Sequence, residues 1–352
     1  TNAIIAGDFD DPHSKVSLLV RNNEMKVRRP EQGTDPNVQY KGAADIALQP
    51  GSAARPDTYM SSQRPDTKPE PWPSDVPTTP DTQVVLDVGH KVEWGWPVAL
   101  YLVTKSIAAG AAVLSPFVAA CGLEGFGAHW LPELMAMVFT LATLFLLVED
   151  LARPMRFYRL LTRPNWKSWL VKGGIVLGAF TALTSAILLA RLMGADALAD
   201  GLRWPNAVLG LLVAGYTAFL FAQCKGRDLW EGRLLLPHLL VLAVLAGSVV
   251  LLPAAGNMVL IDVVMISGLL HLGFIMIERY GHHPTDNATQ AAAFLGTVRL
   301  WGAPAFAQGV VLIIFSFFVL LAAPGIAWIP VLLGLFYYEH TYVRAAQLPP
   351  LS

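Results

Sequence analysis

The chain has 352 residues, of which 54% are hydrophobic and only 14% are charged, and its mean hydropathy is +0.48. This composition lies outside the range of soluble globular domains, and a net charge of −1 gives no basic surface for a nucleic-acid partner. Charge is concentrated near the start, with 24 charged residues in positions 1–93 and 27 in the 259 positions after them. The sequence therefore predicts a polar segment followed by an all-α integral membrane domain.

The polar segment divides into two expected parts. Residues 1–60 contain one short apolar run and too few large apolar side chains to bury a core. We expect them to be extended, largely irregular and packed on a partner. Residues 61–93 are an expected linker, because six prolines fall between Ser61 and Thr82 and favour an extended chain.

Residues 94–352 contain apolar runs that are long enough to cross a bilayer, which takes about 20 residues per helix. Tryptophans such as Trp94, Trp130 and Trp169 begin several runs, as interfacial aromatic residues do. We expect about eight transmembrane helices, near residues 96–120, 130–148, 169–190, 205–223, 236–253, 258–278, 304–323 and 325–342. An even number of spans places both ends of the domain on one side of the membrane.

Basic residues predict the orientation of these helices. Twelve lysines and arginines flank the runs on the N-terminal side, whereas Arg191 and Arg203 alone lie in the opposite connections. By the positive-inside rule the N-terminus is expected in the cytoplasm. Five of the twelve fall between residues 150 and 168, so a functional basic loop is the alternative explanation.

The segment that carries these five residues also carries two carboxylates. Glu149 and Asp150 end the second run, and four arginines follow that share about 120° of a helix surface: Arg153, Arg156, Arg159 and Arg163. Such a helix lies at the membrane interface with its cations toward headgroups or a partner. A topogenic loop with solvated charges is the simpler alternative.

The same segment resembles the signature loop of the NrfD/polysulfide-reductase family of membrane subunits. Asp-Leu-x-Arg-Pro-x-Arg-Phe begins at Asp150, and Leu-Leu-Thr-Arg-Pro-Asn begins at Leu160. Residues 101–110 resemble the opening helix of that family. The resemblance implies an eight-helix anchor without a redox centre of its own, in a bacterial or archaeal inner membrane. It also implies menaquinone or ubiquinone as the cofactor and a molybdopterin catalytic subunit as a partner, so the chain is not expected to be catalytic alone.

Residues 1–17 resemble the C-terminal tail of the ferredoxin-like Fe–S subunit of such complexes. The resemblance implies a fusion of that tail, through the linker, to the membrane subunit, with cluster cysteines in upstream or partner sequence. Cys121 and Cys224 are expected near opposite membrane faces, about 30 Å apart. They are therefore not expected to form a disulfide or to hold a cluster.

Quinone binding is assigned to the residues around the signature loop. Reduction of a quinone takes up two protons, so its site needs an ionisable group within about 2.6–3.2 Å of a carbonyl. Asp150 is the first candidate, because the resemblance places this acidic position beside the quinone head. Arg153 lies one turn away and can keep Asp150 ionised. Glu149, His90 and Trp94 complete the expected site, although His90 can equally be an exposed linker residue.

Ionisable residues within the runs are the proton-transfer candidates. Lys105 lies in the first run, and Asp262, His271 and Glu278 lie in the sixth, where Ser267, His271 and Glu278 share one helical face. Snorkelling of Lys105 to the interface and a packing role for His271 are the alternatives. Glu278 is close to the end of its run and can be interfacial.

Haem is not expected, because its two axial histidines must lie at one depth on facing helices. Counted from the run ends, His238 and His271 differ in depth by roughly 10 Å at ~1.5 Å per residue. His129, His282, His283 and His340 fall in loops or at boundaries. The alternatives to a quinone-linked electron-transfer subunit are a proton-translocating or secondary transporter module without redox chemistry, and a passive anchor.

Overall fold

The computed structural model describes residues 92, 94–149, 162, 164–224, 226–255 and 258–349, and these belong to the second of two units, Gly89–Ser352. The expected tail and linker at residues 1–60 and 61–93 lie outside the described residues, apart from Val92. So does most of the arginine-rich segment after Glu149. The described residues are therefore those of the membrane domain.

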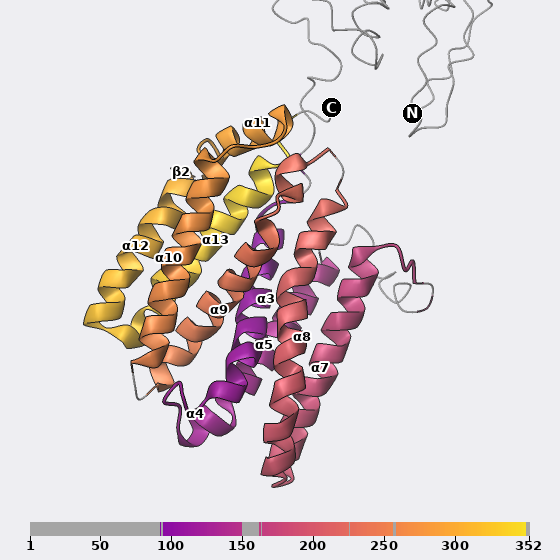
Figure 1. Cartoon of the computed structure of the whole chain (residues 1–352), viewed down its shortest axis with the longest axis vertical. Coiled ribbons are helices and arrows are strands. Elements are labelled where there is room, and N and C mark those ends of the chain that lie inside the picture. The colour runs from indigo at the N-terminus through magenta and orange to yellow at the C-terminus, as the bar shows by residue number, and fades with distance from the viewer. Residues whose placement is uncertain are drawn as a thin grey trace, which may run out of the picture. The chain divides into compact units, whose positions relative to one another are not determined.

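Long helices dominate the domain and run side by side along one direction (Figure 1). Eight have at least 17 residues: α3 (Trp96–Leu114), α5 (Leu131–Glu149), α7 (Trp169–Leu192), α8 (Asp196–Ala222), α9 (Leu235–Leu251), α10 (Val259–Tyr280), α12 (Ala305–Ala322) and α13 (Trp328–Ala345). Among the described residues, the first seven of these are long and apolar enough to cross a membrane. The expected class, an all-α membrane protein, is confirmed.

The last helix, α13, differs from the other seven in composition. Its second half carries Glu339, His340 and Arg344, which lower its apolar character, and it is not among the seven candidate spans. Glu339 and His340 are nevertheless buried, because α13 packs against α12 and α3 inside the bundle. The eighth expected run is thus a helix of the bundle whose polar residues face protein.

Helix α3 is the central element, since it packs against α5, α8, α9 and α13 and 89% of its apolar window is buried. Small residues allow the closest approach, between α3 and α9. A Cβ atom at Gly110 would overlap the Ala243 carbonyl oxygen, and one at Gly247 would overlap the Gly110 backbone. The outer helices instead expose large apolar side chains suited to lipid, such as Phe145 and Phe318.

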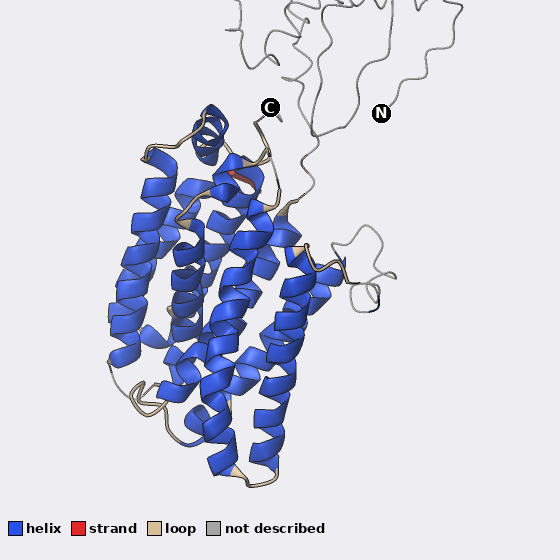
Figure 2. Cartoon of the chain, turned by 45° about the vertical axis from the view of Figure 1, so that its right-hand side comes forward, coloured by secondary structure: helices blue, strands red, loops and turns tan. Residues whose placement is uncertain are grey.

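Short elements close the two ends of the bundle, and Figure 2 shows how little of the domain is strand. One end carries α4 (Gly125–His129) and the 3-10 turns Ser115–Phe117, Leu252–Ala254 and Pro324–Ile326. The other end carries the 3-10 turn Asp228–Glu231, α11 (Asp286–Leu295) and a hairpin of β1 (Arg299–Leu300) and β2 (Ala303–Pro304). Trp301 and Gly302 both have positive φ, as a two-residue hairpin loop requires.

The end of the bundle where the domain begins is also where it finishes. The Trp94 amide donates to Oε1 of Gln347 at 3.0 Å, and Nε2 of Gln347 donates back to the Trp94 carbonyl at 2.9 Å. We call this the Trp94 end. The alternation of the eight long helices brings the beginning of α9 and the last turn of α10 to it as well.

A partly buried ion-pair network holds the opposite end. Arg203 Nε donates to Glu133 Oε1 at 2.7 Å, with both side chains at most 5% exposed. Asp200 accepts from both Arg203 and Arg191, and Asp196 accepts from Arg191 at 2.7 Å. Asp196, Asp200 and Arg203 belong to the first turns of α8. This helix begins at Asp196, nine residues before the predicted start at residue 205, so that Pro205 is internal to the helix.

Candidate functional site

Four buried side chains form one hydrogen-bonded chain inside the bundle. Nδ1 of His238 lies 2.8 Å from Oε1 of Glu278, and Nε2 of His238 lies 2.8 Å from Nδ1 of His271. The Tyr338 hydroxyl donates to Oε2 of Glu278. We call His238, His271, Glu278 and Tyr338 the histidine relay.

Three neighbouring helices supply the histidine relay. His238 lies in the first turn of α9, His271 and Glu278 lie two turns apart on the buried face of α10, and Tyr338 lies on α13. His271 is fully buried, and Glu278 is 7% exposed. Because His271 lies nine residues from the end of α10, the relay reaches roughly 14 Å into the helix at ~1.5 Å per residue.

The histidine relay has one open end. Both nitrogens of His238 and Nδ1 of His271 have partners, but Nε2 of His271 is buried and has none among the described residues. A neutral imidazole donates from one nitrogen and accepts at the other, so a line of such rings can pass a proton along itself. The arrangement is therefore chemically competent for proton transfer between Glu278 and Nε2 of His271.

A second buried ionisable group lies on the central helix. Nζ of Lys105, 1% exposed, donates to the Ala214 carbonyl at 3.0 Å and to Oγ1 of Thr217 at 2.7 Å. It also lies 5.4 Å from the centre of the Tyr216 ring. The buried carboxylate of Glu339 interacts electrostatically with Lys105. Lys105 therefore faces the bundle interior and does not snorkel.

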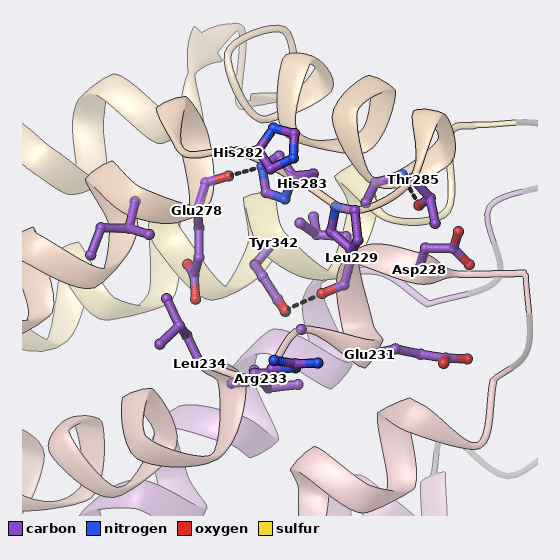
Figure 3. A pocket seen from close by; sticks show the side chains of 15 residues that line it. Asp228, Leu229, Glu231, Arg233, Leu234, Glu278, His282, His283, Thr285 and Tyr342 are labelled. Carbon is purple, nitrogen blue, oxygen red and sulfur yellow. Dashed lines mark hydrogen bonds between the residues drawn. The ribbon is translucent and has the colours of Figure 1, made fainter.

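A pocket of about 610 Å³ opens beside the relay, at the Trp94 end. It is formed by the 3-10 turn at 228–231, the beginning of α9, the end of α10 and the segment leading into α11. Figure 3 shows the Glu278 side chain extending into it, with His282 and His283 above and Tyr342 beside it. Glu278 is the residue that the pocket and the relay share.

The expected quinone-site residues are only partly described. His90, Asp150 and Arg153 lie outside the described residues. Glu149 is the exposed last residue of α5, at the Trp94 end. Trp94 stacks on Phe221 and Trp230, with ring centres 5.7 and 5.1 Å away.

The proton-transfer candidates separate into three positions. His271 and Glu278 are joined through His238, and Lys105 lies on another helix with Thr217. Asp262 lies in the first turn of α10, at the far end from Glu278, and is not part of the relay. The shared face of Ser267, His271 and Glu278 is confirmed, since all three are buried.

The predicted difference in depth between His238 and His271 is wrong, because the two rings are hydrogen-bonded to each other. Counting residues from run ends assumed that α9 and α10 end at the same level, and it ignored the reach of the side chains. The same counting treated His340 as a boundary residue, whereas it is 2% exposed within α13.

Sequence reasoning missed His238 and Tyr338 as members of the site, and also Glu339. Each is a polar residue within an apolar run, which was the available signal.

The two cysteines are free, and Cys121 follows α3 while Cys224 follows α8, at opposite ends as expected. Burial raises the pKa of the Cys121 thiol and that of Cys224. Within the described residues, no group of three or more His, Cys, Asp or Glu residues is arranged to hold a metal.

The sequence from residue 85 to residue 340 matches the family described as polysulphide reductase, NrfD. The chain belongs to this family. The match covers more than two thirds of the chain and reaches every long helix of the bundle. No curated protein matches the chain. Membership in the NrfD family implies a membrane subunit that serves quinone-linked electron transfer in a molybdoenzyme complex with Fe–S subunits.

Proposed function

We propose that the chain exchanges electrons between an Fe–S/molybdopterin oxidoreductase partner and the quinone pool, with coupled proton uptake or release. The observation that carries the proposal is the histidine relay, buried within the membrane helices of an NrfD-family domain. Quinone chemistry moves protons together with electrons, so a quinone-linked subunit needs ionisable groups of this kind.

The quinone, menaquinone or ubiquinone, is proposed to bind at Asp150 and Arg153, with Glu149, His90 and Trp94 nearby. Asp150 follows the exposed end of α5, and Trp94 lies at the same end of the bundle. An Fe–S partner docked on this end would be near the quinone. Residues 1–60 are proposed to belong to that partner's fold, with residues 61–93 as the linker.

Proton transfer is proposed for His271, Glu278 and Lys105, joined now by His238 and Tyr338. Asp262 is also proposed as a proton-transfer residue, but it lies at the opposite end of α10 from Glu278 and is separate from the relay. The domain is proposed to lie in a bacterial or archaeal inner membrane with its N-terminus in the cytoplasm.

A transporter or proton-translocating module without redox chemistry remains the second candidate, because buried ionisable groups such as Lys105 and His271 also serve transport. The two functions separate in one experiment. The complete complex is reconstituted in liposomes. Electron transfer from quinol to the partner is recorded in the presence of an uncoupler, and proton flux is recorded in parallel samples without it. Quinol-linked electron transfer supports the proposal. Proton flux that proceeds without any quinol-linked electron transfer would support the second candidate.

A further inference from the structure

The pocket at the Trp94 end differs in character between its mouth and its interior. Glu231, Arg233 and His282 are exposed at the mouth, whereas Leu229 and Leu235 are buried in its wall. Charged residues at the mouth favour contact with water over contact with lipid tails. The volume of about 610 Å³ is large enough for many waters, each of which occupies about 30 Å³ of liquid.

Glu278 connects this volume to the membrane interior. Glu278 lines the pocket, and its carboxylate accepts a hydrogen bond from Tyr338 and lies 2.8 Å from Nδ1 of His238. Tyr342 also lines the pocket, and its hydroxyl donates a hydrogen bond to the Leu229 carbonyl at 3.0 Å. Of the ionisable side chains that line the pocket, Glu278 is therefore the one bonded to the relay.

We propose that the pocket is an aqueous vestibule through which protons exchange between the solution at the Trp94 end and His271 near mid-bilayer. This inference rests on the proposed function, since redox turnover would drive the exchange. The relay with its vestibule forms a half-channel from one membrane face to Nε2 of His271, which has no hydrogen-bond partner in the part of the chain that the structure describes.

The proton balance of the half-channel is simple. A proton from vestibule water binds the Glu278 carboxylate, which passes a proton to Nδ1 of His238. His238 releases the proton on Nε2 to Nδ1 of His271, which then carries a proton on both ring nitrogens. One proton enters from the vestibule and is held on His271, while His238 ends with its proton on the other nitrogen. Rotation of the rings, or transfer in reverse, restores the starting state.

Ionisable groups on two further helices, α3 and α13, interact with this path. Glu339 of α13 interacts electrostatically with Glu278 and with Lys105 of α3. Lys105 itself is bonded to α8 through Thr217. A change of charge at Lys105 or Glu339 therefore acts on the relay from outside the hydrogen-bonded chain.

The test uses one-sided thiol chemistry on the complete complex in liposomes. Leu234→Cys places a thiol among the pocket-lining residues, and Thr297→Cys places one on an exposed site that does not line the pocket. Both variants are made with Cys224→Ser and treated with a membrane-impermeant, charged methanethiosulfonate. Proton exchange at the Trp94 end is followed with an impermeant dye during quinol turnover, and reduction of an artificial acceptor by the partner reports assembly.

The vestibule predicts that the reagent modifies both variants from the same side, and that only modification of Leu234→Cys slows proton exchange. Glu278→Gln should slow it by on the order of 10²-fold, the scale of a positioned proton donor, with Glu278→Asp recovering part of the rate. Arg233→Cys, another exposed lining residue, repeats the test if Leu234→Cys does not assemble.

Two results would overturn the vestibule. One is full proton exchange in modified Leu234→Cys and in Glu278→Gln. The other is protection of the introduced thiol by added quinone, which would make the pocket a quinone site. In both cases quinol-linked electron transfer by the unmodified complex would persist, whereas its absence would instead refute the proposed function.

Discussion

Nε2 of His238 lies 2.8 Å from Nδ1 of His271, so residues of α9 and α10 share a hydrogen bond in the interior of the bundle. The rings are tilted by 36°, and their centres are 5.1 Å apart. Glu278 is hydrogen-bonded to the other ring nitrogen of His238. The two histidines therefore form a continuous hydrogen-bonded path from His271 to the ionisable Glu278. This relationship carries the proton-transfer part of the proposal.

His271→Phe removes the inner end of the relay while keeping a ring of similar size. We expect proton-coupled quinol turnover of the assembled complex to fall by on the order of 10²-fold, because a positioned proton-transfer group is lost. Assembly, measured by electron transfer to an artificial acceptor, should be retained. His129→Phe, at an exposed position in α4, is the matched control. Unchanged proton stoichiometry and rate in His271→Phe would assign His271 a packing role only.

Arg203→Met breaks the buried pair with Glu133 at the opposite end. Removing one partner of a buried ion pair costs about 3–5 kcal/mol, because the remaining charge is left unpaired. We expect a much lower melting temperature in detergent than for Asp196→Asn, whose side chain is 58% exposed. The double change Arg203→Met with Glu133→Gln should recover part of the loss. Equal melting temperatures for Arg203→Met and Asp196→Asn would show that the pair contributes little.

Gly247→Ala tests the close approach of α3 and α9. The added methyl group would overlap the Gly110 backbone, and overpacking of this kind costs about 1–3 kcal/mol. We expect reduced yield and a lower melting temperature. Gly174→Ala is the control, since a Cβ atom there meets nothing within 4 Å. If both variants melt alike, the two helices can separate at this position without loss.

Reporter fusions test the orientation. Fusions after Lys167 and after Arg299 should report the cytoplasm, and a fusion after Gly256 should report the outside. Arg191 and Arg203, expected in the opposite connections, lie in the last turn of α7 and within α8, and both are engaged in ion pairs. Cytoplasmic signal after Gly256, with external signal at the other two sites, would reverse the orientation and give the arginine-rich loop a functional role.

The sequence was sufficient for the class of fold, because apolar runs near 20 residues long identify membrane helices without reference to neighbours. Boundaries were less accurate where polar contacts decide them. The first turns of α8 carry Asp196 and Asp200, which bind Arg191, and periodicity does not reveal such contacts. The short helix α11 and the turn at 228–231 were not predicted, since both are short and partly polar.

The site was predictable only as separate residues. His271 and Glu278 share a helix, so spacing along α10 was enough to put them on one face. Their connection through His238 depends on how α9 packs against α10, and the contribution of Tyr338 depends on α13 packing nearby. A single sequence contains no record of which helices are neighbours. The pocket was missed for the same reason, since residues far apart in the sequence form it, from 228–235, 277–288 and Tyr342 of α13.

The central claim is that this membrane subunit exchanges electrons with quinone at Asp150. Its most direct test is quinol-linked electron transfer by the complete complex carrying Asp150→Asn, compared with Glu124→Gln, an exposed carboxylate just before α4 at the opposite end of the bundle. We predict that Asp150→Asn abolishes quinol-linked activity while electrons still reach an artificial acceptor, and that Glu124→Gln retains most of it. Full quinol-linked turnover in Asp150→Asn would contradict the claim.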